Sequence, residues 1–269
     1  PKEDEDGNKL LEYDLDDGIY FLEKEDENNR RSIDTWHDWV YEAVKDHTTK
    51  EPEKKNSCVR VFFADDGHHI DLPIYYKDGD VPELADKKNG WRESDPKAFY
   101  EWFNDKAKKN QQLRRFVRYL KAWKNFQEDE HDNQVIPCGF ILTILANDNY
   151  RKDDNDDVAF KNTLKAIREQ LGLGVSFKCY RPTKPTDENL LASYSNEEKE
   201  EFLSNLDDLI TACDNAAQEE NFKKASHYLI EQLGSRFPEG KDEDEKSKNS
   251  RLNVAISTST ISPRPYSRQ

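Results

Sequence analysis

The chain has 269 residues, of which 36% are charged and 34% are hydrophobic, and its formal net charge is −15. An acidic chain is on average a poor surface for duplex DNA or an anionic membrane, so we expect neither of them as a partner. Thirteen Phe, twelve Tyr and five Trp exclude a disordered chain, because aromatic side chains carry much of a core's buried area. The composition favours a very polar globular fold of one large domain or two modest lobes.

The N-terminal part predicts a small α/β lobe over residues 1–90. The hydrophobic pattern changes from alternation to helical spacing and back to alternation. The expected elements are a strand over Lys9–Leu22 interrupted at the turn Asp17-Gly18, a helix over Ser32–Val44, two strands over Cys58–Phe63 and His69–Tyr75 joined at Asp65-Asp66-Gly67, and a polar connection over Asp78–Trp91.

From residue 91 to residue 238 the pattern predicts a helical lobe. The expected helices are Phe99–Asn104, Gln112–Phe126, Pro137–Asn147, Phe160–Leu171, Glu197–Asp214 and Asn221–Leu233, with an extended segment over Lys178–Tyr194. Residues 239–250 are a charged low-complexity linker and residues 251–269 a Ser/Thr/Pro tail. Four tryptophans are predicted to belong to the core: Trp36, Trp39, Trp102 and Trp123.

The cysteines and the apolar runs of the sequence indicate the cellular compartment in which the chain is expected. The four cysteines lie far apart without Cys-x-x-Cys spacing, which makes a zinc site or a disulfide framework improbable. The longest apolar run, Phe140 to Ala146, is far shorter than a membrane span. No signal peptide is recognisable, so we expect a cytoplasmic chain with reduced thiols. The chain holds no methionine and begins at Pro1, and we expect the catalytic lobe to lack its N-terminal part.

Three aspartates have the spacing of a metal site. Asp14 and Asp16 are two apart in an expected strand, so their side chains project from one face. Asp71 lies inside the apolar segment His69–Tyr75, where a carboxylate is costly to bury without a partner. Paired carboxylates that bridge two divalent cations are what metal-dependent phosphoryl transfer needs. Asp17 should point to the other face, and a solvated acidic turn remains the alternative for the whole stretch.

Several blocks of the sequence resemble the cGAS/DncV-like nucleotidyltransferases. The blocks are YDLDDGIYF (13–21), CVRVFFADDGHHID (58–71), HIDLPIY (69–75), WRESDPKAFYEWFND (91–105), RRFVRYLKAWK (114–124) and PTDENLL (185–191). The resemblance implies a polymerase-β-like nucleotidyltransferase lobe with a mixed sheet, followed by a helical lobe, with the active site in the cleft between them. It implies synthesis of a cyclic di- or trinucleotide from ATP, GTP or other NTPs with two Mg²⁺ ions, or Mn²⁺, in bacterial anti-phage signalling. Regulatory or effector proteins would be partners.

The resemblance also implies roles for individual residues. Asp14, Asp16 and Asp71 match the catalytic, metal-binding acids. The expected nucleotide-binding residues are Arg60 at the base, Ser94 before the helical lobe, Lys121 at the triphosphate, Gly139 at a phosphate, and Asp187 in a later loop. Relatives carry a phosphate-contacting serine where Gly139 and Cys138 fall here. They also carry a Gly-Ser pair before the acidic strand, and no such pair precedes Asp14 in this sequence.

Two other functions stay open. The same triad would serve template-independent nucleotide addition to RNA or to a small acceptor, although the acidic composition disfavours RNA. The missing Gly-Ser pair favours a non-enzymatic nucleotide sensor or partner-binding module with a relic site.

Overall fold

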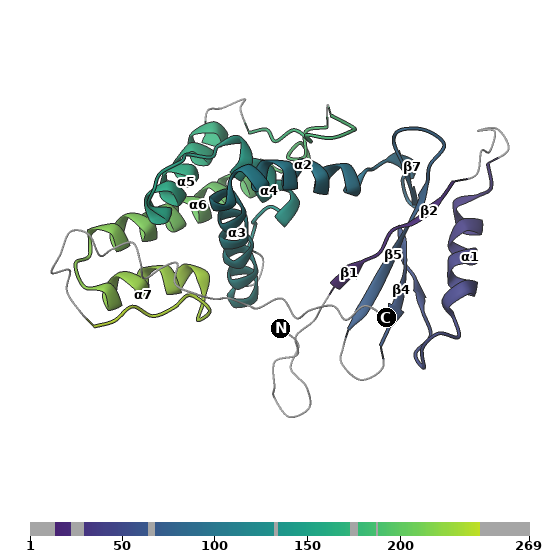
Figure 1. Ribbon diagram of the computed structural model, residues 1–269, viewed down its shortest axis with the longest axis horizontal. Coiled ribbons are helices and arrows are strands. Elements are labelled where there is room, and N and C mark those ends of the chain that lie inside the picture. The colour runs from purple at the N-terminus through teal and green to yellow at the C-terminus, as the bar shows by residue number, and fades with distance from the viewer. Residues whose placement is uncertain are drawn as a thin grey trace. The chain divides into compact units, whose positions relative to one another are not determined.

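The computed structural model describes residues 14–22, 30–63, 68–131, 134–172, 177–186 and 188–242. The chain divides into two units, one of residues 1–103 and 181–188, the other of residues 104–180 and 189–269 (Figure 1). Each unit has its own buried apolar side chains. The expected boundary between residues 90 and 91, and the separate linker and tail, stay predictions.

The central strand of the first unit is β5 (His69–Tyr76). It pairs in antiparallel fashion with β4 (Cys58–Phe62) and β6 (Glu83–Asp86), and in parallel with β1 (Asp14–Asp16) and β2 (Ile19–Phe21). Two further strands, β3 (Glu53–Lys54) and β7 (Gly90–Glu93), pair with β4 and β6. The described residues thus form a seven-stranded mixed sheet in the order β3-β4-β5-β6-β7, with β1 and β2 on β5. The predicted fold class is confirmed.

Helix α1 (Ile33–Val44) covers one face of this sheet (Figure 1). The Ser32 hydroxyl caps the helix by accepting a hydrogen bond from the Thr35 backbone N–H at 3.2 Å. Its buried Trp36 and Val40 form one hydrophobic core with buried residues of the strands. These strand residues are Val59, Val61, Leu72, Ile74, Tyr76 and Ala85. Because strand side chains alternate between faces, the intervening residues of β4 and β5 point away from α1.

The prediction of a polar connection over Asp78–Trp91 was wrong, because this segment forms the β6–β7 hairpin. The strands are only four residues long, and their polar composition conceals the buried Leu84 and Ala85. The turn depends on Asp86, whose carboxylate accepts hydrogen bonds from the backbone N–H groups of Lys88 (2.9 Å) and Asn89 (3.0 Å). Burial acts to raise the pKa of Asp86, but the hydrogen bonds lower it to about 2. The Asn89-Gly90 dipeptide, with φ of +77° at Gly90, was the turn signal that could have revealed the hairpin.

The tryptophan predictions were right for the two fully buried side chains and wrong for Trp39. Trp36 and Trp123 are 0% exposed, Trp102 is half-buried, and Trp39 is 42% exposed. Trp39 lies at the edge of the stripe of α1 that faces the sheet, where its ring centroid is 5.5 Å from that of Trp36 and 5.0 Å from the Arg31 guanidinium. Helical spacing alone did not separate the centre of this stripe from its edge.

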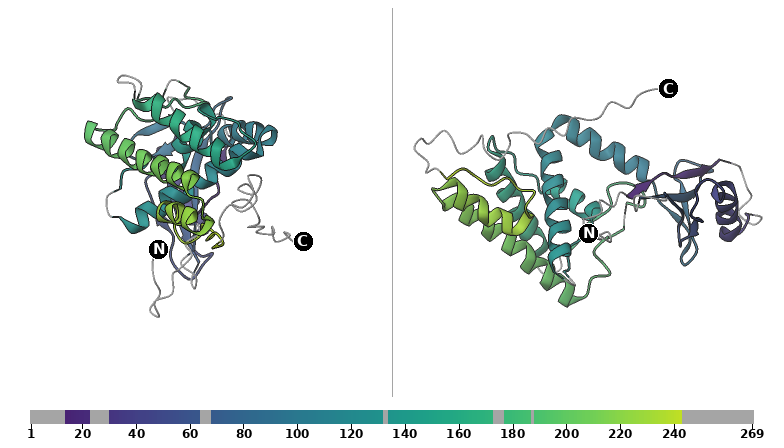
Figure 2. Two further views of the ribbon diagram at one scale, coloured as in Figure 1. Left: turned by 90° about the vertical axis from the view of Figure 1, so that its left-hand side faces the viewer. Right: turned by 90° about the horizontal axis from the view of Figure 1, so that it is seen from below.

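The second unit is helical (Figures 1 and 2). The chain enters it within α2 (Pro96–Lys109), and there follow α3 (Gln111–Glu130), α4 (Gly139–Asp148), α5 (Asp156–Gly172), α6 (Asn196–Gln218) and α7 (Phe222–Leu233). Helix α3 packs against α4 and α7, and α6 packs against α5 and α7. None of the described helices is long and apolar enough to cross a membrane.

Helices α3 and α4 bring the candidate residues of this unit together. Helix α3 buries an apolar stripe of five residues: Leu113, Phe116, Val117, Leu120 and Trp123. In α4 the residues from Ile141 to Ala146 are all buried, so this helix lies in the core of the unit. The first turn of α4 lies against α3 at Lys121.

Candidate active site

One face of the sheet carries the acidic residues that the sequence indicated. Strand β1 places Asp14 opposite His69 and Asp16 opposite Asp71. Strand β4 places Arg60 opposite the same Asp71. Because residues that face each other across neighbouring strands share a face, Asp16, Asp71 and Arg60 form one row across three strands. This face is turned away from α1.

The buried carboxylate of Asp71 is held by Arg60. The guanidinium donates from Nε to Oδ1 and from Nη2 to Oδ2 of Asp71, each at 2.7 Å. Such a bidentate pair is the geometry in which Arg binds a carboxylate most strongly. The hydrogen bond from Arg60 lowers the pKa of Asp71, so the carboxyl group is ionised at neutral pH. Asp71, an acid inside an apolar strand, therefore has the charged partner that its burial requires. This partner is Arg60, the residue that the resemblance expects to contact the nucleobase.

The thiol of Cys58 lies beside this ion pair. Burial raises its pKa to about 12, and the negative charge of Asp71 adds to the increase. Cys58 is consequently an uncharged thiol on this face at neutral pH.

The acidic residues on this face of the sheet meet some of the requirements of a divalent-cation site. Asp16 is exposed and shares a row with Asp71, and carboxylate oxygens are the ligands that Mg²⁺ and Mn²⁺ take. The side chain of Asp14 lies outside the described residues. Among the side chains that are described, no group of three or more His, Cys, Asp or Glu is arranged to hold a metal ion. Both oxygens of Asp71 accept hydrogen bonds from Arg60, so a cation at Asp71 would have to share them with the guanidinium.

Ser94 lies directly after β7, where its backbone N–H donates to the carbonyl of Pro82 at 2.9 Å. Its side chain is hydrogen-bonded to the hydroxyl of Tyr75. Tyr75 in turn stacks on Tyr20, with ring centroids 4.8 Å apart and planes inclined by 14°. The sequence reasoning missed this tyrosine pair. The sequence feature that could have revealed this pair is the alternation in Ile19-Tyr20-Phe21, because it places the side chain of Tyr20 on the same face of the sheet as the acidic residues.

In the helical unit, the structure brings Lys121 and Gly139 into contact. Lys121 is exposed on α3, and Gly139 is the first residue of α4. The preceding Cys138 is the N-cap, is exposed, and makes no side-chain capping hydrogen bond. Asp187 lies outside the described residues. The predicted roles of all these residues stay predictions.

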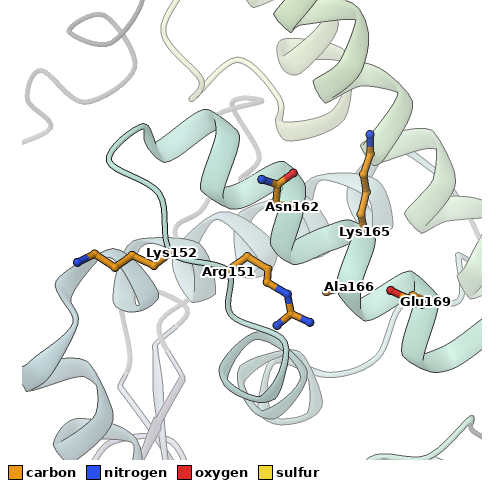
Figure 3. A pocket seen from close by; sticks show the side chains of 6 residues that line it. All are labelled: Arg151, Lys152, Asn162, Lys165, Ala166 and Glu169. Carbon is orange, nitrogen blue, oxygen red and sulfur yellow. The ribbon is translucent and has the colours of Figure 1, made fainter.

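A shallow pocket of about 400 Å³ in the helical unit contains none of the predicted residues. Arg151, Lys152 and Lys165 are the cations among its lining residues (Figure 3). They do not converge, because the ammonium groups of Lys152 and Lys165 point away from the guanidinium of Arg151 (Figure 3). Lys165 is also paired with Asp214 at 2.8 Å. This pocket is therefore no candidate for the triphosphate site.

A mixed sheet with a row of acids on one face, followed along the chain by a helical unit, is the architecture of a nucleotidyltransferase. Family models agree with this class. The nucleotidyltransferase domain of cyclic GMP-AMP synthase DncV-like proteins matches residues 5–75, and the C-terminal domain of cyclic GMP-AMP synthase matches residues 110–243. The chain belongs to the DncV-like nucleotidyltransferases.

Individual relatives extend the match over most of the chain. A cyclic GMP-AMP synthase from Escherichia albertii is 28% identical over 228 residues, which are 82% of this chain and 50% of that protein. The chain thus spans about half of the length of this curated relative. The crystal structure of Escherichia coli DncV in its 3′-deoxy GTP bound form has a TM-score of 0.64 at 23% identity and covers 83% of this chain and 63% of that one.

Two further solved structures share the fold. Vibrio cholerae DncV in complex with the linear intermediate 5′ pppA(3′,5′)pG has a TM-score of 0.62 at 20% identity and covers 84% of this chain and 64% of that one. The Escherichia coli CdnC:HORMA-deltaN complex contains a chain with a TM-score of 0.64 at 16% identity, covering 84% of this chain and 78% of that one.

Proposed function

We propose that this chain belongs to an enzyme that joins NTPs into a cyclic di- or trinucleotide, with ATP and GTP as its substrates. The observation that carries the proposal is the row of Asp16, Asp71 and Arg60 on one face of the sheet. Two carboxylates and a guanidinium in register supply oxygen ligands for a cation and a planar donor for a base. The ligands named for the solved relatives, 3′-deoxy GTP and a pppApG intermediate, support nucleotides as the substrate class.

In this proposal each residue has a separate task. Asp14, Asp16 and Asp71 would hold divalent cations, which when bound lower the pKa of the attacking hydroxyl and neutralise the leaving diphosphate. Arg60 would orient a nucleobase while it neutralises Asp71. Ser94, whose side chain is hydrogen-bonded to Tyr75, would contact a nucleotide through its hydroxyl group.

Lys121 would act on the triphosphate as a point charge on a flexible stem. It makes no ion pair or hydrogen bond with any side chain in the described ranges, whereas Lys124, one turn further along α3, is paired with Glu128. In a chain with 56 acidic residues, an exposed lysine without such a pair is available to an anionic ligand.

The product of the reaction tests the proposal. The full-length native protein, which includes any segment upstream of Pro1, is incubated with pairs of NTPs and Mg²⁺ or Mn²⁺. We expect a product that resists phosphatase and whose mass is that of a cyclic di- or trinucleotide. The absence of any such product with all four NTPs and both metals would rule the proposal out.

Labelling of Cys138 provides an independent measure of nucleotide binding. Cys58, Cys179 and Cys213 are buried, and burial raises the pKa of each thiol to about 12. Among the four cysteines of this chain, iodoacetamide should therefore modify Cys138 within the time that leaves the other three unmodified. We expect millimolar NTP with Mg²⁺ to slow this labelling, because Cys138 adjoins the proposed phosphate contact Gly139. Mass spectrometry of the digested protein identifies the modified cysteine.

The matched control for the labelling experiment is Lys121→Ala. This variant should lose the protection, so its labelling rate should be the same with and without nucleotide. Equal labelling rates of the wild-type protein with and without each of the four NTPs would contradict the proposed contact at α4.

One observation favours a second candidate function, nucleotide binding without turnover. Arg60 engages both oxygens of Asp71, which is also how a protein would stabilise a relic carboxylate without a metal. In that case protection of Cys138 would be observed while no product forms. The two experiments above therefore separate a synthase from a sensor.

A further inference from the structure

The side chain of Lys121 lies along a glycine. A Cβ atom built on Gly139 would lie 2.8 Å from Cε of Lys121 and 3.4 Å from both its Cδ and its Cγ. These are the three nearest heavy atoms outside the glycine's own neighbours and its own helix, and all belong to this one lysine. The aliphatic stem of Lys121 therefore runs across the space that a side chain at position 139 would fill.

The backbone at this position does not require glycine. Gly139 is the first residue of α4, and its φ is not in the positive range that L residues avoid. Alanine is a better helix former than glycine because the glycine backbone loses more conformational entropy on folding. Neither φ nor helix propensity thus accounts for glycine here, whereas the contact with Lys121 does.

The glycine determines where the charge of Lys121 lies. Because Cε is the closest atom, the ammonium group lies beside the first turn of α4. Backbone N–H groups and the helix dipole make the start of a helix favourable for an anion, and the N-cap Cys138 contributes no side-chain capping bond that would compete there. An ammonium held next to these groups increases the positive potential at one point.

We propose that Gly139 is a positioning residue, which by its lack of a side chain holds the stem of Lys121 against the first turn of α4 and so places the ammonium group for the triphosphate of a bound nucleotide. This inference rests on the proposed function and deepens it. It explains why this chain has a glycine where its relatives are expected to have a phosphate-contacting serine.

The test is Gly139→Ala in the full-length protein. The added methyl group would meet the far end of a flexible side chain, so the fold tolerates it and Lys121 must move. We expect a melting temperature equal to or above that of the wild type, and an affinity for NTP with Mg²⁺ that is weaker by about tenfold, as for the loss of one charge-assisted hydrogen bond. Calorimetric titration gives the affinity, and the Cys138 labelling rate reports binding independently.

A double-mutant cycle distinguishes positioning from a merely local effect. In a Lys121→Ala background, Gly139→Ala should have no further effect on nucleotide affinity, because there is no stem left to displace. Gly172→Ala is the matched control, since a Cβ there would meet the flexible Arg168 at 2.3 Å from Nη1 and does not touch Lys121. That variant should bind nucleotide as the wild type does.

The outcomes separate this inference from the proposed function. If Lys121→Ala weakens binding while Gly139→Ala binds like the wild type, or if the two effects are additive, the positioning role of Gly139 is wrong and the triphosphate contact stands. If the wild-type protein binds no NTP, or if Lys121→Ala leaves the affinity unchanged, both the contact and the positioning role are overturned.

Discussion

Replacing Asp71 with asparagine is expected to reduce the formation of the cyclic product by about a thousandfold or more. Metal-bound carboxylates contribute several kcal/mol to stabilisation of the transition state, and each 1.4 kcal/mol corresponds to a factor of ten in rate. Asparagine keeps the shape of the side chain but removes the negative charge that a cation needs. The rate of product formation in the full-length protein, measured by mass spectrometry, provides the test.

A structural explanation for such a loss must be excluded. In Asp71→Asn the new amide oxygen would still accept a hydrogen bond from Arg60, but the guanidinium would lose the negative charge of its bidentate partner. Asp16→Asn removes a charge at an exposed position of the same row and leaves both members of the Arg60–Asp71 pair in place. We expect an equally large loss of product for Asp16→Asn, with a melting temperature within about 2 °C of the wild type, since surface substitutions usually change stability by at most about 0.5 kcal/mol.

Asp17→Asn is the matched control for the acidic stretch. Asp17 follows β1, is exposed, and uses its backbone N–H to donate to the carbonyl of Asp71 at 2.9 Å. The substitution keeps this backbone contact and alters only a side chain that is not expected to hold metal. We expect nearly wild-type turnover. A loss as large as that of Asp16→Asn, or full activity of Asp71→Asn, would show that the row of carboxylates is not the catalytic centre.

The sequence predicts this row better than it predicts the contacts within it. Alternation placed Asp14 and Asp16 on one strand, and the hydrophobic run around Asp71 identified a second strand. A hairpin centred on the expected turn Asp65-Asp66-Gly67 would put residue 60 opposite residue 72, whereas the observed register puts Arg60 opposite Asp71. The Arg60–Asp71 pair was missed because the turn signal does not give the register to one residue, and because Arg60 was considered as a single surface residue and not as a cross-strand neighbour.

Other features depend on contacts that no local pattern encodes. The approach of Lys121 to Gly139 joins α3 to α4 and follows from how the two helices pack. The β6–β7 hairpin is stabilised by Asp86, a buried acid that the sequence does not distinguish from the many exposed ones. In a chain with this many charged residues, hydrophobic periodicity finds long elements and overlooks short polar ones.

Asp156→Ala is expected to cause the largest loss of stability among the charged residues of the helical unit. The buried carboxylate of Asp156 accepts hydrogen bonds from Nε and Nη2 of Arg115 at 2.6 Å each, and from Nε2 of Gln112 at 2.7 Å. These bonds join the start of α5 to α3. Removal of one partner of a fully buried ion pair costs about 3–5 kcal/mol, and the partial exposure of Arg115 reduces our estimate to about 2–3 kcal/mol.

The pKa of Asp156 supplies a second and independent signature of this pair. Burial acts to raise this pKa, but the hydrogen bonds from Arg115 and Gln112 outweigh it, so the net pKa lies below the usual value of 3.8. A carboxyl group with a lowered pKa in the folded state stabilises the protein above its unfolded pKa and loses this contribution as the pH falls through the folded pKa. The difference in free energy of unfolding between the wild type and Asp156→Ala should therefore be constant near pH 7 and shrink below pH 3.8.

Urea unfolding followed by circular dichroism at 222 nm measures both effects, because this signal reports mainly on helices. Asp157→Ala is the control, since Asp157 lies in the same first turn of α5 but is exposed. It should lose only the interaction with the helix dipole, which is worth about 0.3–1 kcal/mol at the surface. If both variants were equally destabilised, the charge at the start of α5 would matter and the link to α3 would not. A loss confined to Asp156→Ala instead assigns the stability to the contact between α3, which carries Lys121, and the rest of the helical unit.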